Sequence, residues 1–112
     1  MGGGGGGVDR GTVEAVKRYK DELRRLGIEP ERIILYGSRA KGIIEEDSDI
    51  DLVVISPVFS RLNLRERLEL LGMAAARIME PVQALGYTAE EYAALGEGTF
   101  VGDEVKPVGI EL

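Results

Sequence analysis

Two aspartates near the middle of the chain are the first candidates for chemistry. Asp49 and Asp51 open an apolar run that reads as a β-strand, and residues two apart on a strand project from the same face. Two such carboxylates repel each other unless a cation lies between them. Taken alone, the pair fits a solvated strand end better than a site, because Asp-x-Asp often occurs by chance.

The second candidate feature is the turn Gly37-Ser38 with its neighbouring cations Arg39 and Lys41. Free backbone N–H groups and a serine hydroxyl at a strand end can bind an anion, and glycine lets a phosphate approach closely. This feature, too, is by itself only a turn.

Together the two features favour a functional site. Asp49 follows Ser38 by eleven residues, so two neighbouring strands would place phosphate donors beside two metal-binding carboxylates. That layout suits nucleoside triphosphate chemistry, in which Mg²⁺ bridges carboxylates and phosphates while an oxygen nucleophile displaces pyrophosphate.

The composition excludes several other chemistries. The chain has no histidine and no cysteine, which rules out histidine-based triads, imidazole zinc sites and thiolate sites. A bound metal must therefore be a hard cation on oxygen ligands, which favours Mg²⁺ or Mn²⁺. The net charge of −6 argues against coating of a nucleic acid, although one local basic site can still hold a small polyanion.

The overall balance of residues indicates one ordinary globular domain. The chain has 112 residues, of which 44% are hydrophobic and 30% charged. No apolar run approaches the roughly 18 residues of a membrane span, and the N-terminus lacks a signal-peptide layout, so we expect a cytoplasmic protein. The glycine run predicts a disordered tail over residues 1–8, followed by a single domain over 9–112.

Hydrophobic periodicity predicts three helices. The first is capped near Thr12 and ends at Gly27, the second covers residues 64–79, and the third follows Thr88, where Thr88 and Glu91 form a capping-box pattern. The buried stripe expected for the second helix consists of Leu64, Leu68, Leu71, Ala75 and Ile78.

Strands are predicted at residues 33–36, 49–55 and 82–87, with a short one near 108–112 and an acidic loop over 43–48. Gly86 could interrupt the third strand. The first two strands are joined by only about a dozen residues, the lower limit for a parallel crossover. We therefore expect an α/β (α+β) fold, a small mixed β-sheet with helices packed on it.

The two motifs together resemble a known superfamily. Gly37-Ser38-Arg39-Ala40-Lys41-Gly42 followed by Ser48-Asp49-Ile50-Asp51-Leu52 is similar to the DNA polymerase beta-like nucleotidyltransferases, in their minimal nucleotidyltransferase branch. The resemblance extends from about Val13 to Tyr92. It implies the nucleotidyltransferase fold, two Mg²⁺ ions and transfer of a nucleoside monophosphate from ATP or another triphosphate. By this resemblance Gly37 and Ser38 bind the triphosphate, Arg39 and Lys41 neutralise phosphate charge, and the catalytic Asp49 and Asp51 hold the metals.

The sequence departs from the superfamily pattern at the third strand. The resemblance implies a third carboxylate there, and the matching position is Gln83. A glutamine amide can orient water or bind a metal weakly, but it can neither accept a proton as a base nor supply negative charge. The nearest acid, Glu80, precedes Pro81 and is expected to project differently.

Two functions follow from these observations. The first is an Mg²⁺-dependent nucleotidyltransferase subunit that moves AMP from ATP to an acceptor on a partner protein. The resemblance implies that this partner is a small helical HEPN-domain protein of a toxin–antitoxin module. The alternative, motivated by Gln83, is a non-catalytic antitoxin or regulatory subunit with the same fold.

Overall fold

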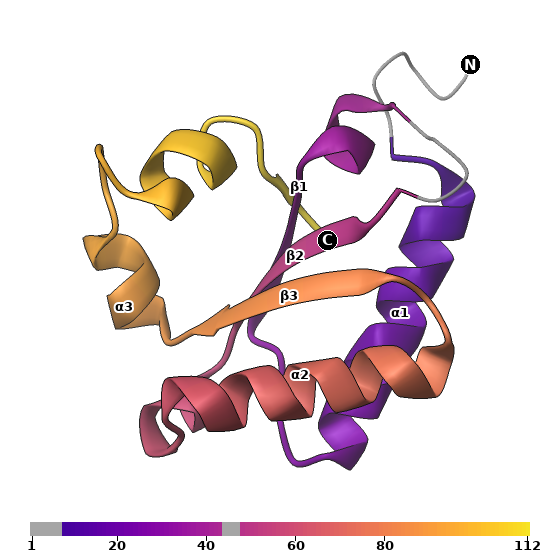
Figure 1. The fold of residues 1–112 in the computed structure, drawn as a ribbon, viewed down its shortest axis with the longest axis horizontal. Helices are drawn as coiled ribbons and strands as arrows, with labels where there is room; N and C mark the ends of the chain where they lie inside the picture. Colours follow the sequence, from indigo (N-terminus) through magenta and orange to yellow (C-terminus); the bar gives the residue numbers. More distant parts are fainter. Residues whose placement is uncertain (1–7, 44–47) are drawn as a thin grey trace.

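The computed structural model describes residues 8–43 and 48–112, which form one four-stranded sheet covered by helices (Figure 1). The predicted disorder of the glycine run and the centre of the predicted acidic loop lie outside the described residues. The elements are α1 (Arg10–Arg25), β1 (Arg32–Tyr36), η1 (Ser38–Lys41), β2 (Ile50–Ile55), η2 (Pro57–Arg61), α2 (Leu64–Ile78), β3 (Val82–Tyr87), α3 (Ala89–Ala94), η3 (Val101–Val105) and β4 (Ile110–Glu111).

The sheet is mixed, as the short connection between the first two strands predicts. Its strand order is β3-β2-β1-β4; β1 pairs antiparallel with β2 and β4, whereas β2 pairs parallel with β3. The register places Asp51 between Tyr36 of β1 and Gln83 of β3. Residues paired in this way project from the same face, so these three side chains belong to one surface.

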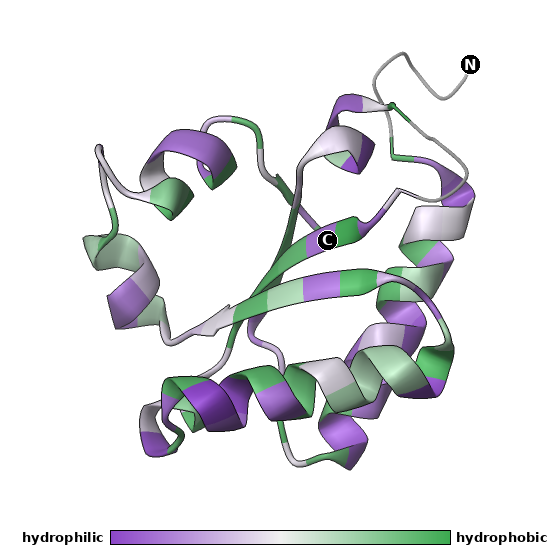
Figure 2. Ribbon diagram, viewed as in Figure 1, coloured by the Kyte–Doolittle hydropathy of each residue, from purple (hydrophilic) through white to green (hydrophobic). Residues whose placement is uncertain are grey.

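Each face of the sheet has its own apolar core. The helices α1 and α2 pack on one face against Leu35, Leu52 and their neighbours. The other face, which carries Tyr36 and Val53, is covered by α3 and η3. The ribbon shows this division, and the hydropathy colouring shows apolar residues along most of the central strands (Figures 1 and 2). Asp51 lies on the face of α3 and η3 because it alternates with the inward-facing Ile50 and Leu52.

The first helix begins earlier than predicted. Its N-cap is Asp9 rather than Thr12, since the Asp9 carboxylate accepts a hydrogen bond from the Thr12 backbone N–H. Thr12 is fully buried, and its hydroxyl donates to the other oxygen of Asp9. The prediction failed because both residues are good N-caps and only the tertiary contacts of Thr12 distinguish them.

The second helix buries three of the five residues predicted for its inward stripe, namely Leu71, Ala75 and Ile78. Leu64 and Leu68 are 68% and 45% exposed, so they do not belong to the buried stripe. Arg67 takes the inward position instead, four residues before the buried Leu71, and its guanidinium donates to the carbonyl oxygens of Phe59, Leu62 and Gly86. The hydrophobic periodicity did not predict this position for Arg67, because the carbonyl groups that bind it come from other segments of the chain.

The C-terminal half confirms most of the predicted elements. Strand β3 has the predicted bounds, and Gly86 does not interrupt it, because its missing Cβ makes room for the ring of Phe59. Thr88 and Glu91 form the predicted capping box of α3. Strand β4 is present, whereas the π-helical turn η3 was not predicted. Within the described ranges, no helix combines the length and apolar character needed to cross a membrane.

Candidate nucleotide and metal site

The candidate site lies at one end of the sheet, where β1 ends and β2 begins. Asp51 is the second residue of β2 and pairs with Tyr36, the last residue of β1. The next residue along the chain is Gly37, which opens the turn η1. The antiparallel register therefore brings the Gly-Ser turn and the Asp-x-Asp motif side by side, as the sequence predicted. Asp49 lies immediately before β2, so that strand begins at Ile50 rather than at Asp49.

Gly37 is required at its position for two reasons. Its φ of 75° lies in the region that favours glycine. A Cβ at this residue would lie 3.2 Å from Cγ of Asp51 and would overlap its Oδ2 atom. The absence of a side chain thus lets the Asp51 carboxylate rest directly against the turn, where an incoming anion and a cation on the carboxylate would be neighbours.

Neither aspartate has a polar partner in the described part of the chain. No hydrogen bond or ion pair joins Asp49 or Asp51 to any described residue, and Asp49 is exposed while Asp51 is half-buried. Burial raises the pKa of Asp51, the negative charge of Asp49 raises it further, and the nearby Arg39 opposes both effects. Burial raises the pKa of Tyr36 to about 12, with smaller contributions from Asp51 and Tyr87. This end of the sheet therefore holds negative charge that a cation would stabilise.

Gln83 occupies the position beside Asp51 on the neighbouring strand. It pairs with Asp51 in the parallel register, is exposed and projects from the same face. The nearest acid, Glu80, is turned toward α1, where Arg18 donates to its carboxylate at 2.8 Å. The third strand thus contributes an amide and no carboxylate to the candidate site.

Arg39 is bound to the protein itself. Its Nη1 donates to the Thr12 hydroxyl at 2.9 Å, its Nη2 to the Ser48 carbonyl at 2.8 Å and its Nε to the Ser48 hydroxyl at 3.2 Å. These bonds fix the turn η1 to the start of α1 and to the segment that leads into Asp49. The geometry favours a positioning role for Arg39 over the direct phosphate contact expected from the sequence.

Lys41 remains available for an anion. It is exposed, and with Gly37 it lines a cavity of about 190 Å³ whose other walls come from Tyr36 and the C-terminal segment. Ser38 is half-buried at the start of η1, beside Gly37. The structure therefore brings Gly37, Ser38, Asp49 and Asp51 to one end of the sheet, with Lys41 at the edge of the adjoining cavity. Sequence reasoning missed the C-terminal wall, because no motif there marks a contact with residues far earlier in the chain.

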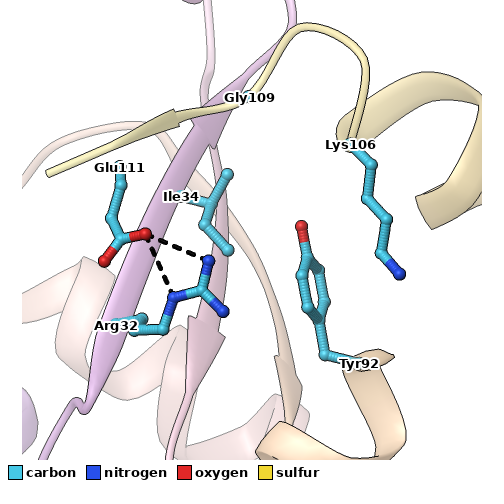
Figure 3. A pocket seen from close by; sticks show the side chains of 6 residues that line it. All are labelled: Arg32, Ile34, Tyr92, Lys106, Gly109 and Glu111. Atoms are coloured by element: carbon cyan, nitrogen blue, oxygen red, sulfur yellow. Dashed lines mark hydrogen bonds and ion pairs between the residues drawn. The ribbon is translucent and has the colours of Figure 1, made fainter. Parts of the chain in front are cut away.

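A second cavity, of about 290 Å³, lies at the other end of the same face (Figure 3). Figure 3 shows Tyr92 between Arg32 and Lys106. Both cations already have partners, because Arg32 pairs with Glu111 at 3.0 Å and Lys106 donates to the Leu95 carbonyl. Arg32 and Tyr36 are four residues apart on β1, or about 13 Å, so this cavity is separate from the carboxylates. Its contacts fasten the C-terminal segment to the sheet.

The donors present fit a divalent cation in part. Asp49 and Asp51 supply two carboxylates of the kind that Mg²⁺ prefers, and Gln83 supplies a neutral amide oxygen beside them. Among residues 8–43 and 48–112, no cluster of three or more acidic side chains could hold a metal. Full coordination would need oxygen atoms from phosphate and water, which is how Mg²⁺ is usually bound with nucleotides.

Comparison with known proteins identifies the family. Residues 16–87, more than half of the chain, match the nucleotidyltransferase domain family, and the chain belongs to that family. Proteins of this family generally use a nucleoside triphosphate and a divalent metal ion. The comparison with curated proteins gives no match.

Two solved structures have a similar fold. One is described as a crystal structure of a toxin-antitoxin with AMP-PNP; it shares 22% identity and a TM-score of 0.61, over 85% of this chain and 69% of that one. The other is a putative nucleotidyltransferase from Sulfolobus solfataricus, with 18% identity and a TM-score of 0.52, over 99% of this chain and 89% of that one. At these identities the likeness supports the fold, and the family match supports a nucleotidyltransferase-type role.

Proposed function

We propose that this protein is an Mg²⁺-dependent nucleotidyltransferase subunit that transfers AMP from ATP to an acceptor on a partner protein. The observation that carries the proposal is the Asp51 carboxylate resting against Gly37, with Asp49 nearby and no polar partner for either aspartate among the described residues. Unpaired carboxylates beside a glycine turn are suited to binding a cation together with the phosphates that it coordinates. The family match supports the class of reaction.

Each residue has a distinct part in the proposed reaction. Asp49 and Asp51 hold the divalent ions, which, when bound, neutralise phosphate charge and make the acceptor oxygen a better nucleophile. Gly37 and Ser38 receive the triphosphate, and Lys41 offsets its charge. The acceptor oxygen forms a bond to the α-phosphorus, the bond from that phosphorus to the bridging oxygen breaks, and pyrophosphate leaves.

Gln83 limits the rate of this reaction. An amide cannot accept the proton that leaves the acceptor oxygen, whereas a carboxylate at the same position could. General-base catalysis contributes roughly 10²–10⁴-fold, so transfer is expected to be slower than with a third carboxylate. The proton then passes to water or to a group of the partner.

The partner we propose is a small helical protein of the HEPN type. The support is the resemblance of the Gly37–Leu52 region to minimal nucleotidyltransferases and the fold shared with a structure described as a toxin-antitoxin. The second candidate function is a non-catalytic antitoxin or regulatory subunit that binds such a partner. Gln83 is the observation that favours it.

Transfer of labelled AMP from ATP to a co-purified partner tests the proposal. We expect label on the partner with the unsubstituted protein and none with Asp49→Ala/Asp51→Ala. Label that persists in the double variant would refute the metal assignment. If no label is transferred although the partner binds, the non-catalytic function is correct.

A further inference from the structure

We propose that the 190 Å³ cavity beside Gly37 binds the nucleoside half of the triphosphate, with Phe100 as the stacking surface for the base. The inference rests on the proposed function and adds a binding site built from the C-terminal segment. That segment lies outside residues 16–87, which match the family. The cavity is lined by Tyr36, Gly37, Lys41, Phe100, Asp103, Glu104 and Val108.

The cavity lies next to the proposed phosphate and metal site. Gly37 lines the cavity and also touches the Asp51 carboxylate, so one residue separates the proposed metal site from the cavity. A triphosphate bound at the Gly37-Ser38 turn can therefore extend its nucleoside into the cavity without a rearrangement of the chain. The volume is below the roughly 300–1,000 Å³ of pockets that enclose a whole drug-sized ligand, so it suits a part of a nucleotide.

Phe100 and Tyr36 form an aromatic pair at this cavity. Phe100 meets Tyr36 edge-on, with ring centroids 5.8 Å apart and an angle of 75° between the planes. Tyr36 is buried, and this contact fixes the position of Phe100 while 55% of Phe100 stays exposed. An anchored aromatic ring with free surface at a cavity mouth is suited to stacking on a nucleobase.

The charges of the residues that line the cavity predict a preference among nucleobases. Lys41 lies with the phosphate-binding turn, whereas Asp103 and Glu104 come from the C-terminal wall. Asp103 already accepts hydrogen bonds from the Gly98 N–H, and Glu104 has no polar partner among the described residues. An ionised carboxylate only accepts hydrogen bonds, so Glu104 favours the amino group of adenine over uracil, whose single N3–H donor lies between two carbonyl oxygens that the carboxylate would repel.

Calorimetric titration of the full chain in Mg²⁺ tests this inference, with three probes. These are a non-hydrolysable ATP analogue, the matching UTP analogue and inorganic tripolyphosphate, which has no nucleoside. Phe100→Ala should weaken binding of the ATP analogue about 5- to 150-fold and change tripolyphosphate binding by less than about twofold. Glu104→Gln should reduce the preference for the ATP analogue over the UTP analogue. Leu64→Ala, which removes an exposed apolar side chain from α2, is the matched control.

The outcomes separate this inference from the proposed function. If Phe100→Ala binds the ATP analogue as tightly as the unsubstituted protein while tripolyphosphate binds normally, the cavity assignment is wrong and the proposed function stands. A preference that survives in Glu104→Gln overturns the role of Glu104. If neither the ATP analogue nor tripolyphosphate binds the unsubstituted protein, the proposed function fails and this inference fails with it.

Discussion

At one end of the β-sheet a charged side chain has all its polar partners within the protein, whereas at the other end two charged side chains have none among the described residues. At the end where β3 finishes, Arg67 is only 12% exposed and donates to three backbone carbonyls and to both oxygens of Glu91. At the end where β2 begins, Asp49 and Asp51 carry two negative charges with no polar partner among the described residues. The chain can evidently satisfy a charged group completely where structure requires it.

This difference separates stability from function. The Arg67 end ties η2, α2, β3 and α3 together, and its hydrogen bonds lower the pKa of Glu91. The Asp51 end brings like charges together and raises the pKa of Asp51. Clustered, unsatisfied charge of this kind lowers stability and is retained where a ligand needs it. Substitutions at each end of the sheet test this separation.

Gln83→Asp should have the largest effect. A carboxylate beside Asp51 completes the third acidic position and provides a base, so AMP transfer should rise by about 10²–10⁴-fold. Initial rates with labelled ATP and the partner give the measurement, and Gln83→Ala serves as the control for loss of the amide. If AMP transfer is absent both before and after the substitution, the site is not catalytic.

Arg67→Ala should cause the largest loss of stability. It removes a nearly buried cation from three carbonyls and from Glu91, which should cost about 2–4 kcal/mol in the free energy of unfolding. The control is Arg65→Ala on the same helix, because Arg65 is exposed and pairs with Glu69 at 3.5 Å. Arg65→Ala should cost less than about 0.5 kcal/mol. Similar losses from the two variants in urea denaturation would contradict the special role of Arg67.

Gly37→Ala should weaken nucleotide binding without unfolding the protein. The added Cβ overlaps the Asp51 carboxylate, so the carboxylate or the turn must move, and displacement of about 1 Å in a site can cost about 100-fold. Gly42→Ala is the control for a positive φ without a clash: its φ of 80° and ψ of 9° lie in the left-handed region, where alanine is strained less than at Gly37 with its ψ of −157°, and a Cβ there meets nothing within 4 Å. Equal affinities of the two variants for an Mg²⁺–ATP analogue would show that the contact with Asp51 is unimportant.

Asp51→Asn should stabilise the metal-free protein slightly. Burial and the charge of Asp49 raise the pKa of Asp51, so its ionised form costs stability at neutral pH, and a neutral amide removes that cost. In EDTA we expect the free energy of unfolding, measured by urea denaturation, to rise by less than about 1 kcal/mol, because water screens a half-buried charge. Asp21→Asn should give no such gain, because Asp21 is exposed and paired with Arg24 at 3.2 Å. A loss of stability in Asp51→Asn would mean that the carboxylate has a structural role.

The fold was predictable wherever local patterns coincide with tertiary contacts. The bounds of β3 and the capping box of α3 depend on neighbouring residues, so they could be read from the chain. The inward position of Arg67 was not predictable, because it depends on carbonyl groups of Phe59 and Gly86 that only the folded chain brings together.

In the candidate site, too, local patterns predicted some contacts and missed others. The proximity of Gly37 and Asp51 followed from the spacing of two motifs on neighbouring strands. The attachment of Arg39 to Thr12 and the position of Phe100 beside Tyr36 join residues 27 and 64 positions apart, and no local pattern encodes such contacts. Motifs therefore predicted the residues proposed to bind phosphate and metal, whereas the cavity wall required the structure.

The most direct test of the central claim is calorimetric binding of a non-hydrolysable ATP analogue to the full chain, with and without Mg²⁺. The unsubstituted protein should bind the analogue only with Mg²⁺, and the double variant Asp49→Asn/Asp51→Asn should not bind it. Thermal melting is the control that the double variant is folded. Binding that is equally tight in EDTA or in the double variant, or no binding to the unsubstituted protein, would contradict the account.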